Sequence, residues 1–207
     1  GFGSTLTAFK PEFTLHGLGI DYKSGPLEIT GAFLASTLTY KGKAYPAYSG
    51  KALLRTATFT LGAIGSYVQL DEGPSLFVYA VLNYPLGGPA FFFVTGLAAG
   101  FGYNRRLLAP AIEQVESFPL VSEAAGTTKP AALADELQRL EAFLPPSVGD
   151  YFLAVGVRFS SFKMIDSFVL LTVAFGHRFE LNILGISTMI LPAAGSDTKD
   201  LTPIAEI

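Results

Sequence analysis

Two adjacent arginines at the end of a long uncharged segment are the strongest candidates for chemistry in this sequence. Arg105 and Arg106 follow Tyr103 and Asn104, and no charged residue lies between Glu72 and Arg105. A guanidinium group binds a carboxylate through two parallel hydrogen bonds, so the pair could anchor an acidic group or a partner. The alternative is that both arginines lie at the solvated end of a sheet. Tyr103, Asn104, Arg105 and Arg106 are therefore the first candidate binding residues.

Catalytic and metal-binding patterns are weak elsewhere in the sequence. The two histidines, His16 and His177, would have to meet in space beside carboxylates to form a metal site or a catalytic pair, and ordinary strand and turn histidines are the simpler interpretation. There is no cysteine, which excludes disulfides, thiol catalysis and cysteine zinc sites. The G-x-S-x-G motif of serine hydrolases is missing. We expect no catalytic residue, no metal and no cofactor, and therefore no enzyme.

Ligand-binding loops are also poorly supported. Residues 49–52 contain Gly-Lys but lack the upstream glycine and the following Ser or Thr of a phosphate-binding loop. The glycines of residues 96–102 lie within a predicted strand, whereas a dinucleotide site needs a turn from strand to helix. The formal net charge is −3 and no basic cluster exceeds Arg105-Arg106, so the sequence argues against nucleic-acid binding.

The uncharged segment that precedes the arginines predicts a β-hairpin. About 20 apolar residues could cross a membrane as a helix, but prolines and glycines divide this segment into residues 75–84 and 90–103. Both pieces are rich in aromatic and β-branched residues, and the intervening LGGP is typical of a turn. Side chains in the second piece alternate between a bulky face and a face of small residues. Neither face is polar, so we expect a central strand covered on both sides, and we add Phe91, Phe93 and Phe101 to the candidate binding residues.

The rest of the chain also predicts antiparallel strands. Turn signals separate the segments expected to be strands, which are residues 12–22, 27–36, 37–41, 51–61 and 63–70 before the hairpin, and 150–162, 167–176 and 178–191 after it. Gly42 and Pro46 mark a loop, and residues 203–207 resemble the start of another strand. Two helical segments are expected between the hairpin and the strand that begins at residue 150. Residues 130–144 predict a helix with a leucine stripe that docks on the sheet, and residues 111–116 predict a helical turn.

Residues 74–110 and 151–192 resemble an uncharacterised domain family found in long, β-rich bacterial and some fungal proteins. The resemblance implies a segment of a larger protein and no catalytic residues. We expect one mainly β domain over residues 1–207, excised from a longer chain, with a helical insert at about 105–146. Its antiparallel strands would form a meander, a sandwich or a partly closed barrel.

The composition indicates what such a domain would do. Half of the residues are apolar and only 15% are charged, against about 25% in ordinary soluble domains. This excess predicts a non-enzymatic structural or binding module that packs against neighbouring domains of the same polypeptide, associates with itself, or holds an apolar ligand. The alternative is a lipid-handling or membrane-associated β-structure. The third interpretation is an enzyme of unknown class, whose activity would rest on Tyr103, Arg105 and Arg106 with carboxylates from elsewhere in the chain. The sequence does not indicate a cellular location.

Overall fold

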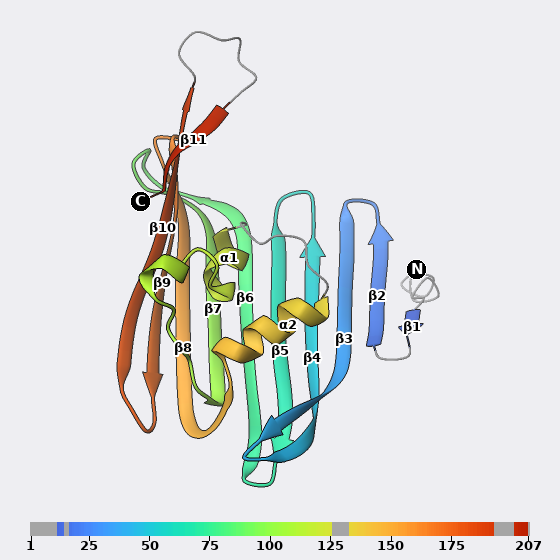
Figure 1. Cartoon of the computed structure of the whole chain (residues 1–207). Coiled ribbons are helices and arrows are strands. Elements are labelled where there is room, and N and C mark those ends of the chain that lie inside the picture. Colours follow the sequence, from blue (N-terminus) through green and yellow to red (C-terminus); the bar gives the residue numbers. More distant parts are fainter. Residues whose placement is uncertain (1–11, 15–16, 126–132, 193–200, 207) are drawn as a thin grey trace.

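The structure is a computed structural model that describes residues 12–14, 17–125, 133–192 and 201–206. Its strands form one antiparallel sheet of 11 strands in which each strand pairs with the next along the chain (Figure 1). In chain order the strands are β1 (Glu12–Thr14), β2 (Gly17–Ser24), β3 (Leu27–Tyr40), β4 (Lys43–Arg55), β5 (Thr60–Leu70), β6 (Gly73–Gly87), β7 (Phe93–Arg105), β8 (Pro146–Ser161), β9 (Ile165–Phe175), β10 (Glu180–Pro192) and β11 (Leu201–Glu206). The mainly β, antiparallel prediction is confirmed, and among the three expected arrangements the described strands form an open meander.

The predicted hairpin is present as β6 and β7. The two strands pair from Leu76 with Tyr103 to Asn83 with Gly96, and β8 pairs with the other edge of β7. The prediction that this is a central strand is therefore confirmed. Its small residues let aromatic rings from neighbouring strands lie over them. A Cβ atom at Gly100 would lie 2.8 Å from the Tyr79 ring.

Several predicted strand boundaries are wrong. Residues 12–22 contain β1 and β2, which pair with each other, and residues 27–41 contain one long strand, β3, rather than two. Strand β4 passes through Pro46, which was expected in a loop, and it ends at Arg55 instead of continuing to residue 61. Pairing of β4 with β5 begins only at Ala47, so the missing N–H of Pro46 faces no partner in that ladder.

Helices cover one face of the sheet. Helix α2 (Leu133–Phe143) lies within the predicted helix and ends one residue before its predicted end, while residues 130–132 of that prediction lie outside the described chain. Its buried Leu137 and Leu140, with Leu144 just beyond, join the core formed on that face by β5 to β9. The 3-10 helix η2 (Ile112–Gln114) lies within the predicted turn, and α1 (Pro119–Ala125) was not predicted. Both α-helices lie on the same side of the strands in Figure 1.

The opposite face of the sheet is uncovered. No described helix or strand packs on it, and Leu97, Phe101 and Tyr103 of β7 are 40%, 45% and 42% exposed. The expectation that both faces of β7 are covered is therefore wrong for the described chain. We call this the open face, and the opposite one the helix-covered face.

Candidate functional site

Asn104 forms a bulge that redirects the two arginines. Its φ of 52° lies in the left-handed region that asparagine tolerates better than most residues, and the β7–β8 register shifts between Tyr103 and Arg105. The Asn104 side chain holds this conformation, since Nδ2 donates to the Pro74 carbonyl at 2.8 Å and Oδ1 accepts from the Gly149 N–H at 2.9 Å. Simple alternation from Tyr103 would place Arg105 on the open face, whereas the bulge places it on the helix-covered face.

Arg105 is completely buried and binds a carboxylate of its own chain. Its Nη1 donates to Glu141 Oε2 at 2.7 Å and to the Leu144 carbonyl at 2.9 Å, and its Nη2 donates to Ser66 Oγ at 3.3 Å. The guanidinium carbon lies 5.2 Å from the centre of the Phe77 ring. Burial lowers the pKa of Arg105, and the adjacent Glu141 carboxylate opposes this change. Of the two interpretations of the arginines, the carboxylate anchor describes Arg105, and it fastens α2 to the sheet.

Arg106 belongs to a second polar cluster at the same end of β7. Its Nε donates to Asp150 Oδ2 at 3.1 Å, and the same oxygen accepts from Ser147 Oγ at 2.6 Å. The other oxygen of Asp150 accepts from the His177 backbone N–H at 3.0 Å, and it lies 2.9 Å from His177 Nδ1. Burial raises the pKa of the Asp150 carboxyl, but these hydrogen bonds and the Arg106 charge outweigh it and hold that pKa well below its usual range.

This second cluster does not have the geometry of a hydrolase. Ser147 donates to Asp150 and not to His177, so the hydroxyl lacks the histidine base that a Ser-His-Asp triad places in contact with it. The other histidine, His16, lies outside the described residues. Among the described residues no group of three or more His, Asp or Glu side chains is placed to hold a metal ion. A pocket of about 230 Å³ beside the cluster carries charges of both signs, from Arg178 and Glu180 as well as the cluster itself.

The open face is uniformly apolar across eight strands, β3 to β10. Strand pairing aligns its side chains in four cross-strand rows. The first two rows are Ala35, Tyr48, Tyr67, Leu76, Tyr103, Tyr151 and Phe175, and then Phe33, Gly50, Gly65, Val78, Phe101, Leu153, Val173 and Leu181. The next two are Gly31, Ala52, Ala63, Ala80, Ala99, Val155, Leu171 and Ile183, and then Ile29, Leu54, Leu61, Leu82, Leu97, Val157, Val169 and Gly185. None of these residues is charged, whereas the water-exposed face of an ordinary antiparallel sheet is lined by polar side chains.

Two glycines make a hollow in the open face. Gly50 and Gly65 pair with each other, and their missing side chains leave an apolar depression of about 450 Å³ edged by Phe33, Tyr67 and Val78. The ring of Phe33 lies close above Gly50, where an added Cβ would be 2.7 Å from Cδ1. This hollow gives the otherwise flat face a shape that a bulky apolar side chain would fit.

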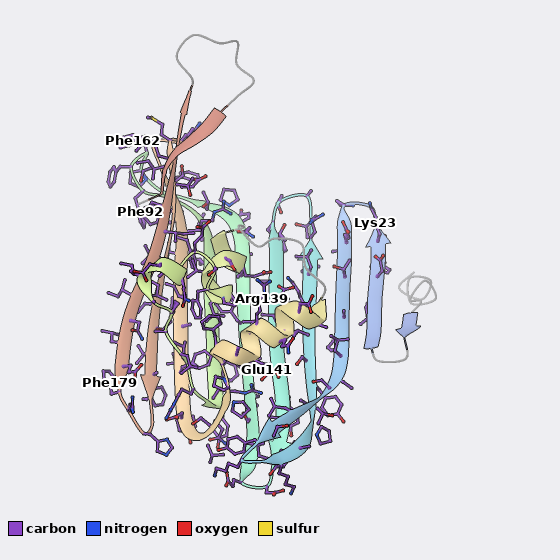
Figure 2. The ribbon with its side chains drawn as sticks, viewed as in Figure 1. Lys23, Phe92, Arg139, Glu141, Phe162 and Phe179 are labelled. Carbon is purple, nitrogen blue, oxygen red and sulfur yellow. The ribbon has the colours of Figure 1, made fainter. Side chains whose placement is uncertain are left out.

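A group of exposed aromatic side chains occupies one end of the sheet. We call it the aromatic tip, and it consists of Phe91, Phe92, Phe93 and Phe162 together with the exposed side chain of Met164. The β6–β7 and β8–β9 turns meet here, because the Phe162 N–H donates to the Ala90 carbonyl at 2.6 Å. Phe91 and Phe162 are 61% and 65% exposed, and Figure 2 shows Phe92 and Phe162 at the upper end of the sheet.

The structure separates the aromatic residues that the sequence grouped together. Phe101 and Tyr103 lie on the open face, as alternation indicated. Phe91 precedes β7, and a register shift between Val94 and Gly96 puts Phe93 out of step with Phe101. Sequence reasoning did not anticipate the bulge at residue 95, nor the role of Asp150, because neither leaves a local pattern.

Comparison with known proteins identifies a family but no function. A family of unknown function (DUF6603) matches the chain over residues 1–207. No curated protein and no solved structure matches it. None of the described helices is long and apolar enough to cross a membrane.

Proposed function

The chain belongs to the DUF6603 family, whose function is unknown, and from that starting point we propose that it is a non-enzymatic binding module whose open face packs against an apolar β-sheet face of a partner. The partner face would come from a neighbouring domain of the same polypeptide. The observation that carries the proposal is the absence of any charged residue from the four rows of the open face. In ordinary antiparallel sheets, strands alternate apolar residues on the core face with polar residues on the face that contacts water.

The size of the open face supports this function. Eight strands spaced about 4.8 Å apart, with about four residues each on this face, cover roughly 38 Å by 24 Å, or about 900 Å². Stable protein interfaces bury about 800 Å² on each partner. The open face alone therefore provides the area that a specific protein interface needs, without any contribution from the loops.

The chemistry of the open face suits a second sheet better than a helix or a charged partner. Sheets that pack face to face bury side chains of both inner faces in a layer about 10 Å thick, and both faces must be apolar. The hollow at Gly50 and Gly65 would receive one bulky side chain of the partner, and the tyrosine row, including Tyr48, Tyr67 and Tyr103, would lie at the border with its hydroxyls in water.

The test combines dye binding with a pair of matched variants. A fluorescent dye specific for exposed apolar surface should bind the folded chain and should bind much less to Val155→Lys, which places a charge in the open face. Ile112→Lys is the control, because Ile112 is 83% exposed but lies in η2 on the helix side of the chain. A monomeric chain that binds no dye, or a control variant that loses as much dye as Val155→Lys, would contradict the proposal.

A second candidate function is contact with a lipid surface, which is favoured by the aromatic tip. Large apolar side chains exposed on turns insert into the boundary between headgroups and acyl chains, and Lys163 beside Phe162 would contact anionic headgroups. Phe162 and Lys163 both have positive φ, so this turn presents the Phe162 ring in a defined conformation.

Vesicle sedimentation distinguishes this candidate from the first. Vesicles that contain anionic lipid should bind the unmodified chain, and Phe162→Ser should reduce the bound fraction while Val155→Lys does not. Equal binding by the unmodified chain and Phe162→Ser would exclude the aromatic tip as a lipid contact.

A further inference from the structure

A groove of about 540 Å³ opens between strand β3 and helix α2 on the helix-covered face of the sheet. The far end of β3 curves across the sheet in Figure 1, and the Tyr40 hydroxyl there accepts a hydrogen bond from the Val148 N–H at 3.4 Å. The volume of the groove lies in the range of about 300–1,000 Å³ that is typical of small-molecule sites. The apolar residues that line the groove come from both elements and are Leu34, Leu38, Ala134 and Leu137.

A chain of hydrogen bonds fixes the direction of the buried Ser49 hydroxyl at the wall of this groove. The Glu141 carboxylate only accepts hydrogen bonds, so the Ser66 hydroxyl must donate its single proton to Glu141 Oε1. Ser49 Oγ must then donate its own proton to Ser66 Oγ, which lies 3.3 Å away. Ser49 is 7% exposed, and among the described residues no donor bonds to its oxygen. The groove therefore has a buried hydrogen-bond acceptor in its wall that lacks a donor.

The charges beside Ser49 cancel each other. Of the described residues that line the groove only Glu141 is charged, and its Oε2 accepts from Arg105 Nη1 at 2.7 Å. An ammonium group would gain little attraction from this neutralised pair, and a carboxylate would find no free proton at Ser49. Removing either ion from water costs far more free energy than removing a hydroxyl. The surroundings of Ser49 therefore favour an uncharged donor.

We propose that this groove binds an uncharged alcohol with an apolar chain, whose hydroxyl donates to Ser49 Oγ. The chain packs between Leu38 and Leu137. The Gln138 amide, which is exposed at the same groove and has no described partner, donates to the oxygen of the hydroxyl. The groove and the hollow of the open face lie on opposite sides of the sheet, so the alcohol leaves the open face free for a partner.

Octan-1-ol is the probe, and its binding is measured by two-dimensional NMR titration of the 15N-labelled chain. We expect saturable shifts of β3 and α2 resonances with a Kd of about 1 mM or below. Octanoate and octylamine have the same chain with a charged head group, and they should bind at least about tenfold more weakly because the groove removes that charge from water.

Two pairs of variants locate the bound alcohol. Ser49→Ala should weaken octan-1-ol binding about fivefold, as expected for one hydrogen bond. Ser167→Ala should not change it, because Ser167 is also 7% exposed and bonded to a serine, Ser187, but lies on β9. Ser36→Trp fills the groove from an exposed position and should abolish binding, whereas Val78→Lys alters only the hollow of the open face and should not.

Far-UV circular dichroism shows whether each variant is folded, and the exposed position of Ser36 makes Ser36→Trp informative even if Ser49→Ala is not. Three results would each overturn the proposal. They are the absence of saturable shifts up to the solubility limit of octan-1-ol, binding of octanoate as tight as that of octan-1-ol, and equal effects of the two variants within either pair.

Discussion

The buried ion pair between Arg105 and Glu141 should be essential for attaching α2 to the sheet. Glu141→Ala leaves the Arg105 guanidinium charged inside the core, and removing one partner of a buried pair costs about 3–5 kcal/mol. We expect the lower end, about 3 kcal/mol, because the Glu141 side chain is 20% exposed and Arg105 keeps its hydrogen bond to the Leu144 carbonyl. That loss is a large part of a total stability of about 5–15 kcal/mol.

Urea unfolding measures this loss directly. Glu141→Ala should lower the unfolding midpoint without changing the slope, and the double variant Arg105→Met with Glu141→Leu should cost clearly less than the two single changes added together. Arg139→Ala is the control, because Arg139 is exposed on the same helix and should change stability by less than about 0.5 kcal/mol (Figure 2). A Glu141→Ala midpoint equal to that of Arg139→Ala, or additive single changes, would refute the assignment of Arg105 as the anchor of α2.

Three further predictions concern the sheet and its polar contacts. Gly100→Ala should lower the unfolding free energy by about 1–3 kcal/mol, because its Cβ would lie 2.9 Å from the Val78 carbonyl, whereas Gly62→Ala, with no atom nearer than 3.8 Å, should change it by less than about 0.5 kcal/mol. Asp150→Asn should make the free energy of unfolding fall less steeply as the pH is lowered. The pKa of Asp150 is lower in the folded chain than its unfolded value near 4. The stabilisation by its carboxylate is therefore present above about pH 4 and is lost as the pH falls through the folded-state pKa. Unfolding midpoints that fall equally steeply in both proteins below that pH would contradict this. Tyr79→Phe removes the hydrogen bond to the Leu120 carbonyl and should cost about 1 kcal/mol by the same unfolding assay, and an unchanged midpoint would show that this bond contributes nothing.

The alternation of side chains made much of the sheet predictable from sequence. β7 illustrates this from Gly96 to Tyr103, where its small residues and its bulky residues occupy the two faces that period-two alternation assigns, whereas the bulges on either side of that segment break the alternation. Alternation did not indicate which face the helices cover. The sequence shows two apolar faces on β7. Only the structure, in which Leu137 and Leu140 of α2 are buried in the core, shows that the face with the small residues is the helix-covered face.

Local turn signals were less reliable, because tertiary pairing decides what they do. Pro46 predicted a loop, yet it lies within β4. It is tolerated there because the pairing of β4 with β5 begins only at the next residue, Ala47. Asn104 carried no distinct signal, although its left-handed conformation decides where Arg105 lies. Asp150 lies far along the sequence from Arg106, and no local pattern could connect the two.

The most direct test of the central claim compares thiol reactivity on the two faces of β7. Ala98 is 3% exposed on the helix-covered face and Ala99 is exposed on the open face, so Ala98→Cys and Ala99→Cys are a matched pair in a chain without native cysteine. The dilute folded chain should react with an apolar maleimide rapidly at residue 99, and at residue 98 only through opening of the fold. Equal reaction rates at the two positions, or faster reaction at residue 98, would contradict an open apolar face as the binding surface of this protein.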